Sequence, residues 1–149
     1  MKKALLIILI LFTALPAWPA EGIIKKKCKK SLPEVTEIVL HEINEHDTLK
    51  LRERYDPMAG GSVDEVDAPV FRVVQFDYPE FTMAILESDP VFALDMPMKF
   101  VIWQDKDGNI WISANDPEYL TRRYALDIYR DEMMNIKRKI ETIIDKASK

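Results

Sequence analysis

Two short apolar segments joined by a polar turn constrain the fold of this chain most strongly. The segments are "MKFVIWQ" (residues 98–104) and "NIWIS" (residues 109–113), and Asp105-Lys-Asp-Gly108 lies between them. The apolar runs indicate strands, and the glycine supplies the positive φ angle that a tight turn needs. The sequence therefore predicts a β-hairpin, and with it a sheet that is at least partly antiparallel.

A further strand is expected at "VFRVVQF", residues 70–76, where apolar residues dominate and prolines flank the run. Pro79 suits the first turn of a helix, with Asp77 or Tyr78 as its N-cap. The apolar residues that follow should continue this helix until the next Asp-Pro pair. The sequence thus predicts a strand followed directly by a short helix.

The last part of the chain is expected to be helical, with Asn115 or Asp116 as a cap and Pro117 at the start. From there on, apolar residues recur at intervals of three and four: Leu126, Tyr129, Met133, Ile136, Ile140, Ile143 and Ala147. This spacing gives one apolar stripe on a helix. We expect the stripe to pack on the sheet of the same domain. A coiled-coil seam between two copies is the alternative.

The segment before these elements has two interpretations. Ser31 and Glu34 have the spacing of a capping box that begins a helix, whereas residues 36–43 are rich in β-branched residues. Residues 47–56 could form a short helix. Residues 56–69 contain two prolines, two glycines and four acids, which predicts an acidic loop without a packed element.

The N-terminus is typical of an export signal. Two lysines precede an apolar run from Ala4 to Leu15, and small residues and prolines follow. The run is short for a membrane span. We expect export and a mature chain that begins between residues 18 and 23. Residues 25–30 contain five lysines, and the positive-inside rule would keep such a segment in the cytoplasm. An uncleaved membrane anchor is therefore the alternative to export.

The sequence divides into three parts: residues 1–22, a signal peptide or membrane anchor; residues 23–35, a Lys-rich leader; and residues 36–149, a single domain. The chain has 21 basic and 25 acidic residues, and removal of Lys2 and Lys3 leaves 19 against 25, a net charge of −6. A nucleic-acid partner is disfavoured, because phosphate binding needs a dominant basic face. Cys28 is the only cysteine, which excludes an intramolecular disulfide, and we expect its thiol to be exposed in the leader.

Familiar catalytic and metal-binding motifs do not fit. His41 and His46 are five residues apart, whereas the zinc motif H-E-x-x-H needs four. Residues 105–109 share letters with a calcium loop, but Ala114 stands where the twelfth position needs a carboxylate. No phosphate-binding glycine loop is present in the sequence. We therefore expect no metal site and no cofactor, and we favour a protein that is not an enzyme.

The aromatic residues could line a pocket, but aromatic side chains usually fill cores in domains of this size. The residues concerned are Phe76, Phe81, Phe100, Trp103 and Trp111. We expect core packing, with at least one of the two tryptophan rings buried.

Three stretches together resemble the family catalogued as domain of unknown function 302. They are "VLHEINEHDTLKLR", "FRVVQFDYPEFTMAILESDP" and "ALDMPMKFVIWQDKDGNIWISANDP". The resemblance covers roughly residues 36–126. It implies an α+β fold, a small and largely antiparallel sheet with short helices on one face and a longer C-terminal helix, often in exported bacterial proteins and without an established activity. It also favours a strand over a helix at residues 36–43.

The chain departs from the family pattern in two places. The family's turn usually reads Gly-Asn-Pro or Cys-Asn-Pro, whereas this chain has Asp77-Tyr78-Pro79, so a role of that Asn or Cys does not carry over. The family also commonly has a longer helix before its first strand. Because only the Lys-rich leader stands there, an abridged N-terminal edge is expected.

These observations favour a non-enzymatic domain of the periplasm or cell envelope that binds a small ligand or a protein. Candidate binding residues are His41, Phe76, Asp77, Tyr78, Trp103 and Asn115. The alternative is a hydrolase-like or other enzyme that uses carboxylates and His41 near the Asp77 turn. A homodimer through a sheet edge or the last helix is expected as a partner state, and contact with a membrane only through an uncleaved N-terminal segment.

Overall fold

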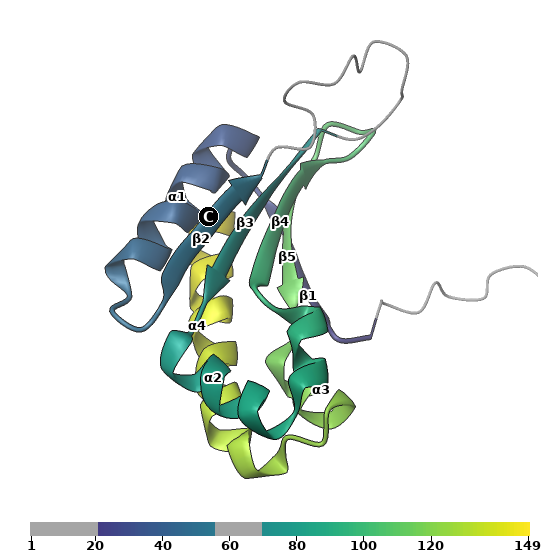
Figure 1. The fold of residues 1–149 in the computed structure, drawn as a ribbon. Coiled ribbons are helices and arrows are strands. Elements are labelled where there is room, and N and C mark those ends of the chain that lie inside the picture. The colour runs from purple at the N-terminus through teal and green to yellow at the C-terminus, as the bar shows by residue number, and fades with distance from the viewer. Residues whose placement is uncertain (1–20, 56–69) are drawn as a thin grey trace, which may run out of the picture.

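The computed structural model describes residues 21–55 and 70–149, so the expected signal segment at residues 1–20 and the expected acidic loop at residues 56–69 lie outside the described residues. Within the described part, five strands form one antiparallel sheet in the order β1-β5-β4-β3-β2 (Figure 1). The strands are β1 (Ile23–Cys28), β2 (Lys50–Tyr55), β3 (Phe71–Asp77), β4 (Met98–Gln104) and β5 (Ile110–Asn115).

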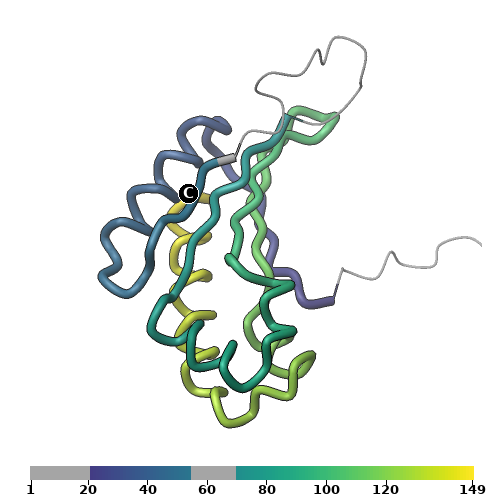
Figure 2. The backbone as a smooth tube through the Cα atoms, viewed as in Figure 1, coloured from purple at the N-terminus to yellow at the C-terminus, as the bar shows by residue number. Residues whose placement is uncertain are grey.

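The helices are divided between one face and one end of this sheet. They are α1 (Leu32–Glu45), α2 (Pro79–Ser88), η1 (Pro90–Asp95), α3 (Pro117–Arg123), η2 (Asp127–Tyr129) and α4 (Arg130–Ser148). The long helices α1 and α4 pack side by side against the same face of the sheet (Figure 2). The shorter elements α2, η1, α3 and η2 gather at the lower end in the view of Figure 1. The expected α+β fold with a long C-terminal helix is confirmed.

The apolar stripe of the last helix forms the centre of the core. Met133, Ile136, Ile140, Ile143 and Ala147 are all buried, and they share one core cluster with strand residues such as Phe100 and Ile112. The expectation that this stripe packs on its own sheet is confirmed, so the alternative of a coiled-coil seam between two copies does not apply to it. Regular α-helix begins at Arg130, a few residues after the stripe begins.

The strand expected at residues 36–43 is wrong, because this segment belongs to α1. The backbone N–H of Ser31 donates to Glu34 Oε2 at 3.0 Å, as the capping-box spacing indicated. Leu32, Val35, Val39 and Ile43 are buried and follow helical spacing. Burial of this face against α4 and the sheet therefore outweighs the β propensity of the branched residues.

The expected leader at residues 23–35 is also wrong, because Ile23–Cys28 is an edge strand paired with β5 and α1 begins at Leu32. Cys28 is only 6% exposed, contrary to the expected exposed thiol, and burial raises the pKa of that thiol. Lys26 points to the helical side, where its Nζ lies 2.7 Å from Asp145 Oδ1 of α4. Lysines are tolerated here because an edge strand leaves their charged ends at the surface. The N-terminal edge of the sheet is therefore not shortened as expected, because β1 and α1 are both formed.

Residues 47–55, the described part of the segment that could form a short helix, are not helical. Lys50–Tyr55 instead form edge strand β2, which pairs with β3. Its register shifts between Leu51 and Glu53, so Arg52 is the extra residue of a β-bulge. The segment is short and charged, which conceals a strand from sequence periodicity but suits the edge of a sheet.

The predicted hairpin is confirmed, and Asp105 holds its turn together. The Asp105 carboxylate accepts hydrogen bonds from the backbone N–H groups of Asp107 (3.0 Å) and Asn109 (2.8 Å). It also accepts from the Asn109 side chain (3.0 Å) and from the indole N–H of Trp111 (2.8 Å). These donors, the Trp111 indole first, lower the pKa of Asp105 from 3.8 to about 2. Gly108 adopts a φ of 82°, as the turn requires.

The expectation that a tryptophan ring lies in the core is wrong. Trp103 and Trp111 are cross-strand partners on the sheet face opposite α1 and α4, and both are half-buried. Their neighbours Ile102 and Ile112 point to the helical face and are fully buried. The alternation of a strand explains this result, since only every second side chain can face the core.

Truncation of the buried stripe should destabilise the domain itself. We expect Ile140→Ala to lower the free energy of unfolding by about 2 to 5 kcal/mol, because it removes buried methyl groups and leaves a cavity. Glu141→Ala, at the exposed neighbouring position, should change it by less than about 0.5 kcal/mol. Chemical denaturation of both variants tests this, and equal effects would mean that α4 does not pack on the sheet.

The hairpin predicts a specific titration behaviour. Trp111→Phe removes the strongest donor to Asp105, so the pKa of Asp105 should rise from about 2 towards 3.8. Because the folded pKa is lowered, the stabilisation from this carboxylate is complete above the ordinary value and is lost as the pH falls towards about 2. NMR titration of the carboxyl carbon measures the shift, with Trp103→Phe as the control that should leave it unchanged.

Candidate binding site

A cavity of about 270 Å³ lies where β3 ends and α2 begins, and we call it the Asp77 cavity. Its lining residues are Arg52, Asp77, Pro79, Thr82, Met83, Leu86, Ala93, Met96 and Pro97. They come from edge strand β2, the end of β3, helix α2, and the segment from η1 to the start of β4. Most of these side chains are apolar, and Arg52 and Asp77 are the charged ones.

Helix α2 supplies the apolar wall through its spacing. Pro79, Thr82, Met83 and Leu86 stand at positions i, i+3, i+4 and i+7, so they share one face of the helix. A different face of the same helix carries Phe81 and Ile85 into the core. Because α2 is anchored by that second face, it holds the cavity wall in a fixed position. Met83 remains 58% exposed, which places it at the edge of the cavity.

Asp77 is the polar centre of the site. Its Oδ2 atom lies 2.7 Å from Nε of Arg52, and the side chain as a whole is 14% exposed. Its Oδ1 atom is fully buried and accepts no hydrogen bond from the residues that the structure describes. A buried acceptor without a donor costs free energy, in the range of about 1 to 3 kcal/mol for typical groups. The Asp77 carboxylate is therefore an incompletely satisfied acceptor in the wall of an apolar cavity.

Arg52 reaches this carboxylate because of the β-bulge. Arg52 is inserted between Leu51, which pairs with Phe76, and Glu53, which pairs with Gln75, and its side chain extends towards Asp77. Bulges commonly re-aim a side chain at a sheet edge in this way. The ion pair uses Nε, and no described acceptor is hydrogen-bonded to the two terminal nitrogens of this guanidinium group. About half of the side chain is exposed, so Arg52 stands at the open side of the cavity.

The structure brings three of the six predicted residues to this end of β3, but only Asp77 lines the cavity. Phe76 is fully buried and stacks on Phe100, with ring centroids 4.9 Å apart. Tyr78 is the N-cap residue of α2 and packs edge-on against Phe81 at 6.0 Å. Both residues therefore support the site from the core side.

The other three predicted residues lie elsewhere. His41 is exposed on α1, which covers the opposite face of the sheet from the Asp77 side chain. Trp103 lies beside Trp111 on the sheet face opposite α1 and α4, which we call the open face. Neither residue lines a cavity with Asp77, so His41 and Asp77 are not brought together as the enzyme alternative requires.

Asn115 belongs to a separate polar cluster. Its side-chain amide donates to Asp95 Oδ1 at 3.1 Å, while the Tyr124 hydroxyl donates to Asp95 Oδ2. Burial raises the pKa of Tyr124, and the hydrogen bond to Asp95 raises it further. Arg123 lies 3.3 Å from the same carboxylate. Because every member has a partner here, the cluster ties η1 to β5 and α3 and serves the fold.

Sequence reasoning missed Arg52, Met83, Leu86 and Met96. The stripe at positions 79, 82, 83 and 86 is visible in the sequence and could have indicated a second apolar face on α2. Arg52 had no such signal. Its role depends on a bulge in an edge strand, and neither feature has a sequence pattern in a short charged segment.

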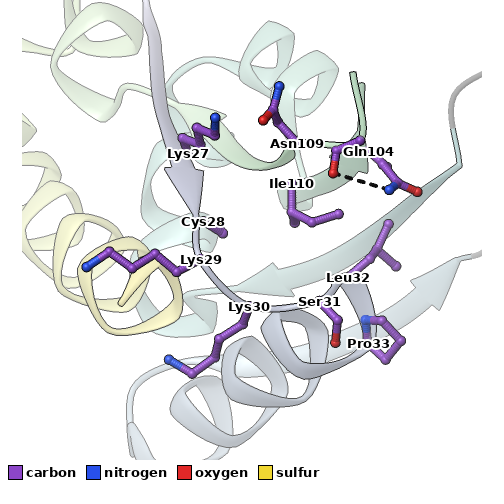
Figure 3. Close-up of a pocket in the computed structure, with 11 residues that line it drawn as sticks. Lys27, Cys28, Lys29, Lys30, Ser31, Leu32, Pro33, Gln104, Asn109 and Ile110 are labelled. Atoms are coloured by element: carbon purple, nitrogen blue, oxygen red, sulfur yellow. Dashed lines mark hydrogen bonds between the residues drawn. The ribbon is translucent and has the colours of Figure 1, made fainter. Parts of the chain in front are cut away.

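A second cavity, of about 480 Å³, lies between the end of β1, the start of α1 and the hairpin (Figure 3). Lys27, Lys29 and Lys30 are among its lining residues, but Figure 3 shows the side chains of Lys29 and Lys30 directed away from Gln104 and Asn109 on its other side. The start of α1 is already capped by Ser31 and Glu34. This cavity therefore lacks the convergent charges of an anion site, and we favour the Asp77 cavity.

Neither a metal centre nor a membrane span is found in the described part of the chain. Among residues 21–55 and 70–149, no three side chains of His, Cys, Asp or Glu are grouped so that they could hold a metal ion. In the same residues, no helix combines the length and the apolar character needed to cross a membrane.

Part of the chain is similar in sequence to part of several curated proteins. Over 78 residues the chain is 27% identical to the fluoride-specific ion channel FluC 1 of Brucella suis biovar 1, and equally to FluC 2 of Brucella melitensis biotype 1. These matches cover 52% of this chain but only 31% and 29% of those proteins, so the chain spans about a third of their length.

A solved structure and a family model complete the comparison. The crystal structure of an uncharacterized conserved DUF302 protein from Bacillus stearothermophilus superimposes with a TM-score of 0.72 at 12% identity. The superposition covers 87% of this chain and 100% of that chain, and it shows a shared fold. The model of the family described as domain of unknown function DUF302 matches residues 24–147. The chain therefore belongs to the DUF302 family of domains of unknown function.

Proposed function

We propose that this protein is a non-enzymatic binding module of the bacterial cell envelope. Its site is the Asp77 cavity, and its ligand is a small, mainly apolar molecule that carries a hydrogen-bond donor. One observation carries this proposal: Asp77 lines an apolar cavity, and its buried Oδ1 atom has no donor among the residues that the structure describes. Ligand sites usually combine apolar walls with a few polar groups that fix orientation.

Several features favour binding over catalysis. Asp77 is the one carboxylate among the described lining residues, and its Oδ2 is engaged by Arg52. General acid-base catalysis needs a group in reach of the proton that it transfers, and His41 lies on the other side of the sheet. A ligand donor near Asp77 would satisfy an acceptor for which the described part of the chain offers no donor. The polar group therefore supplies orientation and specificity.

The location in the envelope is supported by the N-terminal sequence. Two lysines, an apolar run and small residues follow one another before β1, as in an export signal. The matched relatives in Brucella are named as ion channels, which are proteins of membranes. Because the chain covers only about a third of these relatives, we propose for it a location near a membrane but no channel activity.

Matched small probes test the site. Benzamide presents an apolar ring and an N–H donor, whereas methyl benzoate has a similar shape but no donor. We expect benzamide to shift the backbone NMR signals of Thr82, Leu86 and Met96, and to bind about tenfold more tightly than methyl benzoate, a difference of about 1.4 kcal/mol. Asp77→Ala should remove this preference, since it removes the acceptor.

Glu80→Ala is the matched control, because Glu80 is an exposed carboxylate on α2 outside the cavity lining. It should leave both affinities unchanged. Equal binding of the two probes, or shifts confined to other parts of the chain, would contradict the proposed site. A well-dispersed spectrum of Asp77→Ala shows that any loss is not caused by unfolding.

The mature N-terminus tests export separately. We expect a chain that begins between residues 18 and 23, and the structure favours a start that retains Gly22. The Gly22 carbonyl accepts from the backbone N–H of Asp116 at 2.8 Å, and an added Cβ would lie 2.4 Å from the Tyr119 ring. Intact-mass measurement on envelope-fraction protein should therefore give a start at residue 18 or 21. Full-length chain in the cytosol would contradict export.

A further inference from the structure

The two charged residues of the Asp77 cavity form a pair without net charge. Arg52 and Asp77 are the charged members of its lining, and Arg52 Nε lies 2.7 Å from Asp77 Oδ2. Beside the lining, edge strand β2 adds one charge of each sign on the same face, since Lys50 is the cross-strand partner of Asp77 and Glu53 is that of Gln75. Within the cavity and on the edge strand beside it, the described charges therefore balance.

Both members of the pair keep hydrogen-bonding capacity. The ion pair uses Nε of Arg52, and no described acceptor is hydrogen-bonded to the two terminal nitrogens of that guanidinium group. A carboxylate has about four lone-pair sites. Among the described residues, the Asp77 carboxylate accepts a hydrogen bond from Arg52 alone. Cationic donors and an anionic acceptor thus lie side by side, and each can take a further partner.

The volume and the walls limit the size of a ligand. The cavity measures about 270 Å³, which is below the range of roughly 300–1,000 Å³ that is common for ligand sites. Met83, Leu86 and Met96 are the long apolar side chains of its lining. Methionine side chains adapt to irregular shapes. The cavity therefore suits a molecule with one apolar branch beside its polar groups.

We infer that the ligand of the Asp77 cavity is a free α-amino acid with an apolar side chain, a step that rests on the binding function proposed for this cavity. The ammonium group of the amino acid donates to the Asp77 carboxylate. The carboxylate of the amino acid accepts from the terminal nitrogens of Arg52. The side chain packs against the apolar wall that Met83, Leu86 and Met96 form.

Charge complementarity selects this class of ligand. One carbon atom joins the ammonium and carboxylate groups of an α-amino acid, so its two charges are near neighbours, as are those of Asp77 and Arg52. An amine without a carboxylate brings a positive charge towards Arg52, and a carboxylate without an ammonium brings a negative charge towards Asp77. The zwitterion places each charge against its opposite, and charge-assisted hydrogen bonds are roughly twice as strong as neutral ones.

A peptide does not have this pattern. Its internal α-amino and carboxyl groups are converted into neutral peptide bonds, and a terminal residue retains one of the two charges. The ligand is therefore a single amino acid, in agreement with the small volume of the cavity.

Three probes with the same apolar branch test this assignment. L-Leucine carries both charged groups, 3-methylbutylamine lacks the carboxylate, and 4-methylpentanoate lacks the ammonium. The full chain is titrated with each probe at neutral pH, and binding is followed by the backbone NMR signals of Thr82, Leu86 and Met96. Leucine should bind more tightly than either analogue by about tenfold or more, because it alone forms both charge-assisted contacts.

Substitution of each charged residue should remove one part of this preference. Arg52→Gln should abolish the advantage of leucine over 3-methylbutylamine, because it removes the cation that faces the carboxylate. Asp77→Asn should abolish the advantage of leucine over 4-methylpentanoate, because the side-chain amide is neutral. Arg54→Gln is the matched control, since Arg54 lies on the same strand but pairs with Glu37 of α1 at 3.3 Å. It should leave all three affinities unchanged.

Benzamide, the probe of the proposed function, separates the two possible failures. If benzamide shifts these signals and leucine binds no more tightly than its two analogues, the amino-acid assignment is overturned while the binding site stands. If neither benzamide nor leucine shifts them, the proposed function and the assignment fail together. A full advantage of leucine in both Arg52→Gln and Asp77→Asn would also overturn the assignment. Well-dispersed spectra of the variants separate lost binding from lost folding.

Discussion

The burial of the α4 stripe against the sheet is the interaction on which the rest of this structure depends. Ile136, Ile140 and Ile143 are almost completely buried, and each such side chain contributes about 1.5 to 3 kcal/mol by leaving water. Helix α1 packs beside α4, where Lys146 Nζ also lies 2.7 Å from Glu42 Oε2. With two long helices on one face, the sheet has a single core side. The other face then has to be made of side chains that tolerate water.

This division explains where contact surfaces can arise. The core side uses large aromatic and branched residues of the three central strands, such as Phe76, Phe100 and Ile112. The Asp77 cavity instead forms at the end of β3, where the chain leaves the sheet and α2 turns a second face towards it. The open face carries the half-buried aromatic residues Phe71, Trp103 and Trp111. The two surfaces have different chemistry, since one centres on the Asp77 carboxylate and the other on two stacked tryptophan rings.

The elements that could be predicted from the sequence are those whose local signals agree with their tertiary role. The hairpin has a turn glycine at positive φ, the β3–α2 unit has Pro79 at its junction, and α4 has a regular stripe. The edge strands could not be predicted, because β1 and β2 are rich in charged residues that only the margin of a sheet accommodates. At residues 36–43 the capping box indicated a helix correctly, and the β-branched composition was misleading because packing decided the outcome.

The candidate site could be predicted only in part for a similar reason. Asp77 stands at a turn that the sequence marks clearly, and it does line a cavity. Arg52 depends on a bulge, and His41 and Asn115 depend on which side of the sheet each element occupies. Such relationships between distant segments have no local signature. These spatial relationships become visible only when the helices have been placed against the sheet, and a single sequence does not show that placement.

The central claim is that α4 packs on one face of this sheet, so that Trp103 and Trp111 on the other face keep contact with solvent. The indole N–H signals of Trp103 and Trp111 report on it directly, because both rings lie on the open face. In two-dimensional NMR spectra recorded with increasing amounts of a water-soluble paramagnetic agent, the account predicts that these two signals broaden while backbone signals of the buried α4 stripe stay sharp. Indole signals that stay sharp while the α4 signals broaden would contradict it.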